Sequence, residues 1–268
     1  MNGRTMLWSC LAATAVFYTA AACAQEIDKE RAEEEKARLA RSLEHMKSFV
    51  ARLAGDDEKE VELKEQPVLT FGDSTRGNKN GSLWVFGTKG RPHAFVELFK
   101  QAELADWAHT ATLTGKDRII LKTPRSGQWK PEKLQIEPAA IANAPVPEPK
   151  EAARLRQIRE LARRFTAHEF WDPNNSRFEL RLLAQPIHRY SDEKQELVDG
   201  AAFVLANGTN PEVILLIEAL GKEPKEGQWH YSLARAGSAE LHVELDGKEV
   251  WKCPRAFGNA KDVFFFFY

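Results

Sequence analysis

Histidine and carboxylate side chains are the groups in this sequence that could do acid–base or metal chemistry, and one pair stands together at His168-Glu169. A zinc-binding helix of the H-E-x-x-H type needs a second histidine four residues after the first. Position 172 holds aspartate instead, and the following Pro173 would end a helix. We therefore interpret His168 as part of a helix terminus and predict no metal site.

His188 is the histidine whose surroundings best suit a ligand site. It lies on the apolar face of a predicted strand, next to Arg189. The simpler interpretation is a buried histidine that bonds to the backbone. The alternative is a group that faces a ligand and acts together with Arg189.

Two tryptophan–histidine patterns recur at matched places, Trp107-Ala108-His109 and Trp229-His230. In the simpler interpretation, Trp107 and Trp229 each anchor a hydrophobic core. In the alternative, they form two aromatic platforms in a cleft between two halves of the protein, where ligand pockets often lie. The candidate ligand-binding residues are therefore His188, Arg189, Trp107, His109, Trp229 and His230.

Other catalytic signatures are missing from the sequence. It has no Gly-rich phosphate loop, no cysteine pair and no G-x-S-x-G motif, so we expect no catalytic residue and no cofactor. Cys253 is expected to be a buried or half-buried thiol, with a nucleophile as the alternative. The chain has 38 Lys and Arg against 39 Asp and Glu, and this balance argues against a nucleic-acid partner.

The N-terminus has the pattern of a secretory signal peptide. A positive Arg4 precedes an apolar run over residues 7–22, and Ala22-Cys23-Ala24 fits a cleavage site. An uncleaved membrane anchor is the main rival, because the apolar run nearly reaches spanning length. Lipid modification of Cys23 is a third interpretation. The sequence thus predicts export to the periplasm or the medium, with membrane attachment only if the signal stays uncleaved.

The chain also contains an internal repeat. At an offset of 119 positions (186 − 67), Pro67 matches Pro186 and Gly81 matches Gly200, and at 122 positions (229 − 107) Trp107 matches Trp229. Self-similarity of this kind indicates duplicated structural units. We predict an α+β fold of two tandem repeats, each a helix followed by an antiparallel sheet, in a pseudo-twofold arrangement.

Apolar periodicity predicts the elements of each repeat. Helices are expected over residues 28–54 and 151–165, and Asn207-Gly208 and Asp246-Gly247 are expected to be hairpin turns. The C-terminal run of phenylalanines should pair at a sheet edge or cap a core. The predicted organisation is a signal peptide at 1–24, a charged helix leading into repeat 1 at 25–59, the repeat 1 sheet at 60–136, a Pro/Ala-rich linker at 137–150, the repeat 2 helix at 151–178, the repeat 2 sheet at 179–257 and an aromatic strand at 258–268.

The segments LRLLAQPIHRYSDE, DGAAFVLANGTNPEVILLIEA and RLRQIRELARRF resemble a family of predicted exported bacterial proteins without an assigned function. The resemblance implies export and duplication, and it implies no activity. Our leading hypothesis is an exported, non-catalytic protein that binds a small ligand or an envelope protein between its repeats. The alternatives are an exported hydrolase that uses His188 or His230 with a carboxylate, and a structural protein of the cell envelope.

Overall fold

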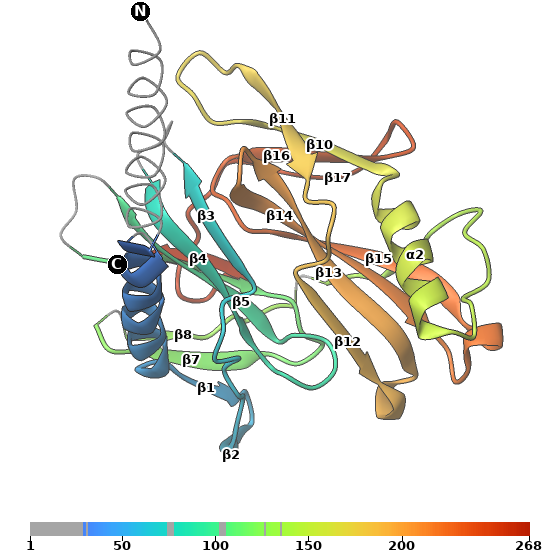
Figure 1. The fold of residues 1–268 in the computed structure, drawn as a ribbon, viewed down its shortest axis with the longest axis horizontal. Coiled ribbons are helices and arrows are strands. Elements are labelled where there is room, and N and C mark those ends of the chain that lie inside the picture. Colours follow the sequence, from blue (N-terminus) through green and yellow to red (C-terminus); the bar gives the residue numbers. More distant parts are fainter. Residues whose placement is uncertain (1–28, 31, 74–77, 102–105, 126, 135) are drawn as a thin grey trace, which may run out of the picture. The chain divides into compact units, whose positions relative to one another are not determined.

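The computed structural model describes residues 29–30, 32–73, 78–101, 106–125, 127–134 and 136–268 (Figure 1). The predicted signal peptide at 1–24 lies outside these residues. The chain divides into two compact units, Met1–Met46 and Lys47–Tyr268. The described part of the first unit is helical.

The second unit consists mainly of antiparallel strands. Its helical elements are α2 (Glu151–Ala162) and two short 3-10 helices, η1 (Glu193–Gln195) and η2 (Pro224–Glu226). Its strands are β1 (Val50–Leu53), β2 (Asp56–Glu60), β3 (Leu69–Asp73), β4 (Asn78–Phe86), β5 (Ala94–Gln101), β6 (Ala108–Leu113), β7 (Ile119–Thr123), β8 (Gly127–Trp129), β9 (Ala139–Ala140), β10 (Phe165–Phe170), β11 (Arg177–Leu182), β12 (His188–Asp192), β13 (Leu197–Asn207), β14 (Asn210–Leu220), β15 (Gln228–Arg235), β16 (Glu240–Leu245), β17 (Lys248–Cys253) and β18 (Phe264–Phe267).

These strands form three sheets. The smallest has four strands in the order β2-β1-β7-β8, and a second has five in the order β18-β6-β5-β4-β3. The largest has nine strands, ordered β17-β16-β10-β11-β13-β14-β15-β9, with β12 also paired to β13. The long hairpin β13–β14 turns at Gly208 and Thr209, between the paired Asn207 and Asn210, and Gly208 has a φ of 62°. The predicted hairpin is therefore confirmed, with its turn one residue later than Asn207-Gly208, and Asp246-Gly247 joins β16 to β17 as predicted.

The predicted α+β fold of tandem helix-plus-sheet repeats is wrong. Strands account for 48% of the protein and helices for 16%, and the described residues hold two α-helices beside a curled, antiparallel half-barrel sheet. The physical reason is that the sheets bury most of their own apolar surface, because they curl and pack on one another. The pairing also crosses the predicted boundaries, because β9 joins β15 and β18 joins β6.

Two predicted helices are shorter than the apolar spacing suggested. The first ends at residue 47, and the next strand begins at Val50. The second ends at Ala162, and Phe165 begins β10. His168 therefore lies in a strand, so the predicted helix terminus at that residue is wrong. In both cases ladder pairing with a distant strand, β7 or β16, prevails over local helical periodicity.

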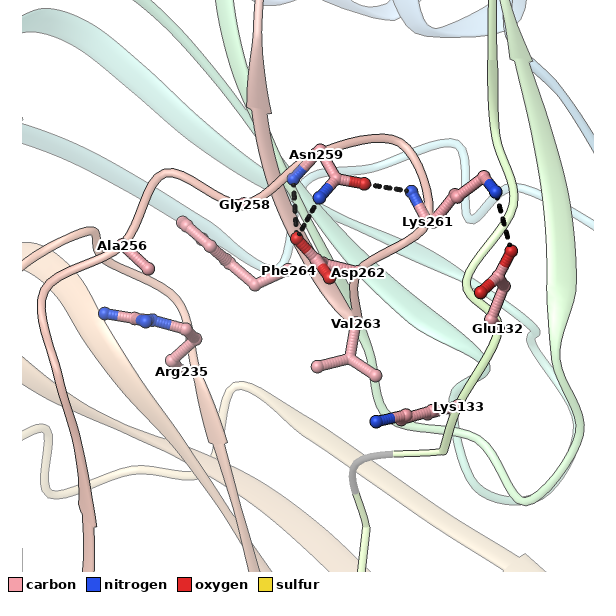
Figure 2. Close-up of a pocket in the computed structure, with 10 residues that line it drawn as sticks. All are labelled: Glu132, Lys133, Arg235, Ala256, Gly258, Asn259, Lys261, Asp262, Val263 and Phe264. Carbon is pink, nitrogen blue, oxygen red and sulfur yellow. Dashed lines mark hydrogen bonds and ion pairs between the residues drawn. The ribbon is translucent and has the colours of Figure 1, made fainter.

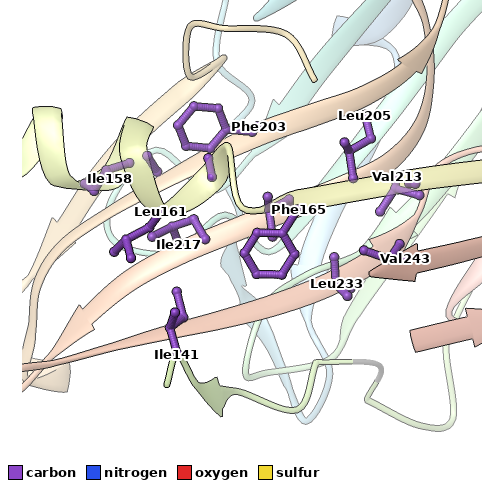
Figure 3. Packing of buried hydrophobic residues seen from close by; sticks show 14 of the residues in the cluster. Ile141, Ile158, Leu161, Phe165, Phe203, Leu205, Val213, Ile217, Leu233 and Val243 are labelled. Atoms are coloured by element: carbon purple, nitrogen blue, oxygen red, sulfur yellow. The ribbon is translucent and has the colours of Figure 1, made fainter. Parts of the chain in front are cut away.

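The concave face of the nine-stranded sheet encloses a hydrophobic core, which we call the concave core (Figure 3). Because the sheet curls, residues of β10 and β16 lie over residues of β13, β14 and β15. Ile158 and Leu161 of α2 pack into the same cluster, and so does Ile141 after β9. Burial of each such side chain contributes about 1.5–3 kcal/mol, so this cluster is a major source of stability. Its labelled members in Figure 3 are Ile141, Ile158, Leu161, Phe165, Phe203, Leu205, Val213, Ile217, Leu233 and Val243.

The opposite face of the nine-stranded sheet packs against the five-stranded sheet. Leu83, Val85 and Phe95 come from β4 and β5, and they form one cluster with Val204 and Ile214 of the nine-stranded sheet. We call this cluster the inter-sheet core. Side chains alternate between the two faces of a strand, so β13 and β14 contribute to both cores. This explains why their sequences are apolar on both sides.

A buried ion pair accompanies the inter-sheet core. Arg91, which precedes β5, donates from Nε to Oε1 of Glu218 on β14 at 2.7 Å, and its Nη2 bonds to the other carboxylate oxygen. The hydroxyl of Tyr190 on β12 donates to the same Oε1 at 2.9 Å. Arg91 is 5% exposed and Glu218 is 1% exposed, so each charge depends on the other for compensation.

Two aromatic rings lie directly over glycines of the neighbouring strand. A β-carbon added to Gly200 would lie 2.5 Å from the Tyr190 ring, and one added to Gly81 would lie 2.3 Å from the Phe71 ring. Both pairs are in register, Gly200 with Tyr190 and Gly81 with Phe71. The glycines therefore allow β12 and β3 to lay their rings flat on the adjacent strand.

We predict that Gly200→Ala and Gly81→Ala each lower the free energy of unfolding by about 1–3 kcal/mol, because the added methyl displaces a ring. Gly72→Ala is the matched control, since a β-carbon there meets no atom within 4 Å. Chemical denaturation measures the three variants. Equal stabilities for the Gly200, Gly81 and Gly72 variants would contradict the close packing.

Candidate ligand pockets

The six predicted site residues are divided among different faces of the sheets. Trp229 is fully buried in the concave core, where it pairs with Ala219. His230 points to the other face of the same sheet, in register with Glu218, and its Nδ1 lies 3.1 Å from the carbonyl oxygen of Gln228. Trp229 and His230 therefore do not face one common space.

His109 lies on the face of the five-stranded sheet opposite to the inter-sheet core. It is buried, and its ring stacks on Phe267 at 4.9 Å between centroids and lies 5.3 Å from Phe49. Trp107 is half-buried just before β6, with the Lys100 ammonium 5.0 Å from the centre of its ring. Both residues therefore lie away from Trp229 and from His188.

His188 is half-buried at the start of β12, in register with Ala202 of the inter-sheet core. Its ring stacks on Tyr190 at 5.9 Å, and its Nε2 is buried with no hydrogen-bond partner among the described residues. Burial lowers the pKa of His188 to about 4, and the charge of Lys64 acts in the same direction. The ring is therefore neutral at physiological pH.

Arg189 points to the other side of β12 and helps to line a polar pocket of about 310 Å³. Its Nε donates to Oδ1 of the buried Asp199 at 2.9 Å, and Arg154 of α2 donates from Nε to Oδ2 of the same carboxylate at 2.8 Å. Arg189 also bonds to Glu151 through Nη1 at 2.9 Å. The hydrogen bond from Arg189 to Asp199 raises the pKa of the guanidinium. Two cations thus meet two carboxylates, and this network fixes the start of α2 on the sheet.

A larger pocket, of about 590 Å³, lies where β15 of the nine-stranded sheet meets β18 of the five-stranded sheet (Figure 2). Arg235 and Phe264 lie on one side, and the ion pair of Lys261 with Glu132 lies on the other, at 3.0 Å. Its lining residues are Glu132, Lys133, Arg235, Ala256, Gly258, Asn259, Lys261, Asp262, Val263 and Phe264. None of the six residues singled out from the sequence is among them.

Arg235 is held in this pocket by hydrogen bonds to backbone carbonyl oxygens. Its guanidinium donates to the carbonyl oxygens of Gly237, Ala239 and Pro254 at 2.6–3.0 Å, and its Cζ lies 5.1 Å from the centre of the Phe264 ring. Burial lowers the pKa of Arg235, yet an arginine stays charged in proteins. The pocket therefore has a fixed positive group beside an aromatic wall.

The rim of the pocket is built from two segments that bond to each other. The amide of Lys130 donates to the carbonyl of Ala260 at 2.7 Å, and the amide of Glu132 donates to that of Lys261 at 2.9 Å. Asp262 accepts from the backbone and side-chain nitrogens of Asn259 at 2.9 and 2.6 Å. Lys133 is exposed and has no hydrogen-bond or ion-pair partner among the described residues, so its charge is available to a ligand.

Three further groups, on His168, His242 and Cys253, have environments that decide their chemistry. His168 stacks on His242 at 4.8 Å, and His242 bonds to Glu249 through Nδ1 at 2.7 Å. Burial lowers the pKa of His168, whereas in His242 the bonds to Glu249 and Glu240 outweigh burial and raise it. Burial raises the pKa of Cys253 to about 11, so it is a protonated thiol at neutral pH.

Comparisons with protein-family models, curated proteins and solved structures found no match. Within the described residues, no group of three or more His, Cys, Asp or Glu side chains is arranged to hold a metal ion. In the same part of the chain, no helix is both long and apolar enough to cross a membrane.

The low pKa of His188 makes stability depend on pH. The pKa is 6.5 for an unperturbed histidine and about 4 in the folded state, so between these values the unfolded chain binds more protons. We expect the contribution of His188 to be present above pH 6.5 and to be lost as the pH falls toward 4. Two-dimensional NMR should show His188 titrating near pH 4 and His242 titrating above its ordinary value.

His188→Leu is the matching variant, because leucine is an apolar residue without a titratable group and can occupy a half-buried position. Denaturation of this variant should show a smaller loss of stability between pH 6.5 and pH 4 than the parent protein shows. A parent-like pH profile in His188→Leu, or a titration of His188 near 6.5, would contradict its burial.

Proposed function

We propose that this protein is an exported, non-catalytic binding protein that holds a small organic anion in the 590 Å³ pocket between β15 and β18. The single observation that supports this most strongly is the combination of volume and lining. The volume falls within the range of small-molecule sites. The lining combines the apolar surface of Phe264, Val263 and Ala256 with positively charged groups.

The charges of the pocket favour an anionic ligand. Lys261 is paired with Glu132, and Asp262 is bonded to Asn259, so these groups are largely compensated. Lys133 and Arg235 remain as positive groups without a carboxylate bonded to either among the described residues. A ligand with an apolar body and one carboxylate would place its body on Phe264 and its charge near Lys133.

Export is part of the same proposal and rests on the N-terminal sequence pattern alone. The charges and the apolar wall of the pocket specify only the chemistry of the partner. It is a small molecule with a carboxylate, or an envelope protein that presents an acidic side chain. The hydrolase alternative requires a histidine held by a carboxylate at a site open to substrate. His230 instead lies beside the carbonyl of Gln228, and among the described residues His188 has no hydrogen bond to a carboxylate. Assays on ester, glycoside and phosphate substrates would test this alternative.

We predict that phenylbutyrate binds this pocket more tightly than the corresponding alcohol does. Lys133→Glu should weaken phenylbutyrate binding at least about tenfold, which corresponds to about 1.4 kcal/mol, because it replaces the attracting charge by a repelling one. Isothermal titration and amide chemical shifts of residues 256–264 measure both effects.

Lys222→Glu is the matched control, because Lys222 is exposed and does not line the pocket. It should bind phenylbutyrate as the parent protein does. The proposal fails if a panel of aromatic and aliphatic carboxylates shows no saturable binding, or if Lys133→Glu and Lys222→Glu behave alike.

A further inference from the structure

The four-stranded sheet carries a third, separate pocket on its outer face, with a volume of about 230 Å³. Its six lining residues form two rows that follow from the strand register. Val50 pairs with Lys122, which pairs with Gln128, and these three make the first row. Arg52 pairs with Ile120. Lys130 directly follows β8 and lies two residues after Gln128, so its side chain is on the same face of the sheet as that of Gln128. Arg52, Ile120 and Lys130 make the second row. The pocket thus spans β1, β7 and the end of β8.

Three of these six side chains are cationic. Nη2 of Arg52 contacts Oε1 of the exposed Glu60 at 3.4 Å. Within the part of the chain that the structure describes, Lys122 and Lys130 have no acidic partner, and both are exposed. The Nε of Arg52 is buried and has no hydrogen-bond partner among the described residues. The site therefore has more positive charge and more donors than its own residues compensate.

The spacing brings these charges close together. Neighbouring strands lie about 4.8 Å apart, so Arg52 and Lys130 are about 10 Å apart at their backbones, with Lys122 between them in the adjacent row. Like charges on one face of a sheet repel each other. The exposed Val50 and the half-buried Ile120 form a nonpolar floor between the cationic groups. An anion bound above this floor would contact all three cations and remove their mutual repulsion.

We propose that this pocket binds a tetrahedral oxyanion, a phosphate or sulfate group, either free or carried by a small molecule. The Arg52 guanidinium offers its fork of N–H groups, and the two lysines supply point charges. The Gln128 amide adds a further donor at the rim. The site is distinct from the pocket between β15 and β18, shares no lining residue with it, and stands independently of the proposed function.

The test is a titration of the protein with inorganic phosphate, sulfate and phenyl phosphate, at an ionic strength held constant with sodium chloride. Two-dimensional NMR should show saturable shifts of the amides of residues 50–53 and 119–130, with a dissociation constant of about 1 mM or tighter. Saturation by phosphate and sulfate alike would identify a general oxyanion site. Tighter binding of phenyl phosphate would identify an organic ester as the preferred form.

Variants of single cations complete the test. Lys122→Gln and Lys130→Gln should each weaken phosphate binding about tenfold, and Lys122→Gln, which lies away from the rim of the 590 Å³ pocket, should leave phenylbutyrate binding unchanged. Lys248→Gln, an exposed lysine on β17, is the control and should bind phosphate as the parent protein does. Shifts that do not saturate, or equal binding in all three variants, would overturn the proposal.

Discussion

The face-to-face packing of the nine-stranded sheet on the five-stranded sheet is the constraint on which the rest of the second unit depends. β13 and β14 are apolar on both faces because one face lines the concave core and the other lines the inter-sheet core. A strand of this kind cannot lie at a surface without exposing one of its faces to water. The curl of the sheet, the position of α2 and the placement of β4 and β5 all satisfy this requirement.

Two short segments extend this packing across the sequence. β9 adds to the edge of β15, and β18 adds to the edge of β6. The residues that precede β18 bond to the segment after β8 and create the 590 Å³ pocket. The pocket therefore arises from the way the sheet edges are completed, and not from the tryptophan and histidine side chains inside the sheets.

Much of the strand pattern could be predicted from the sequence. The apolar runs that contain Val85 and Ile214 lie in β4 and β14. The hairpin signalled by Asn207-Gly208 is present with its turn one residue later, and Asp246-Gly247 forms the expected turn. The helix ends were not predictable in the same way. Val50 and Phe165 continue a helical spacing, but each pairs in a strand with a residue far away in sequence. Local periodicity carries no information about that distant partner.

The candidate sites were harder to predict than the strands. Trp229 matches Trp107 in sequence, yet it is a core residue, and a buried tryptophan and a ligand platform have the same sequence signal. Lys133 and Lys261 form a rim only because residues 130–132 bond to residues 260–261. The 230 Å³ pocket of the four-stranded sheet depends on the pairing of β1 with β7. The predicted helix over residues 28–54 excluded this pairing. The available sequence signal for this pocket was that the polar residues Lys122, Gln128 and Lys130 alternate with the apolar residues Leu121 and Trp129.

The most direct test of the sheet packing is a double-mutant cycle on Arg91 and Glu218, which join the β4–β5 loop to β14 and are 127 residues apart in sequence. Either Arg91→Met or Glu218→Gln alone leaves a buried group without its partner and should cost about 3–5 kcal/mol of unfolding free energy. The double variant should cost less than the sum of the single variants by at least about 2 kcal/mol. Additive effects of the two substitutions would contradict the packing of these two sheets on each other.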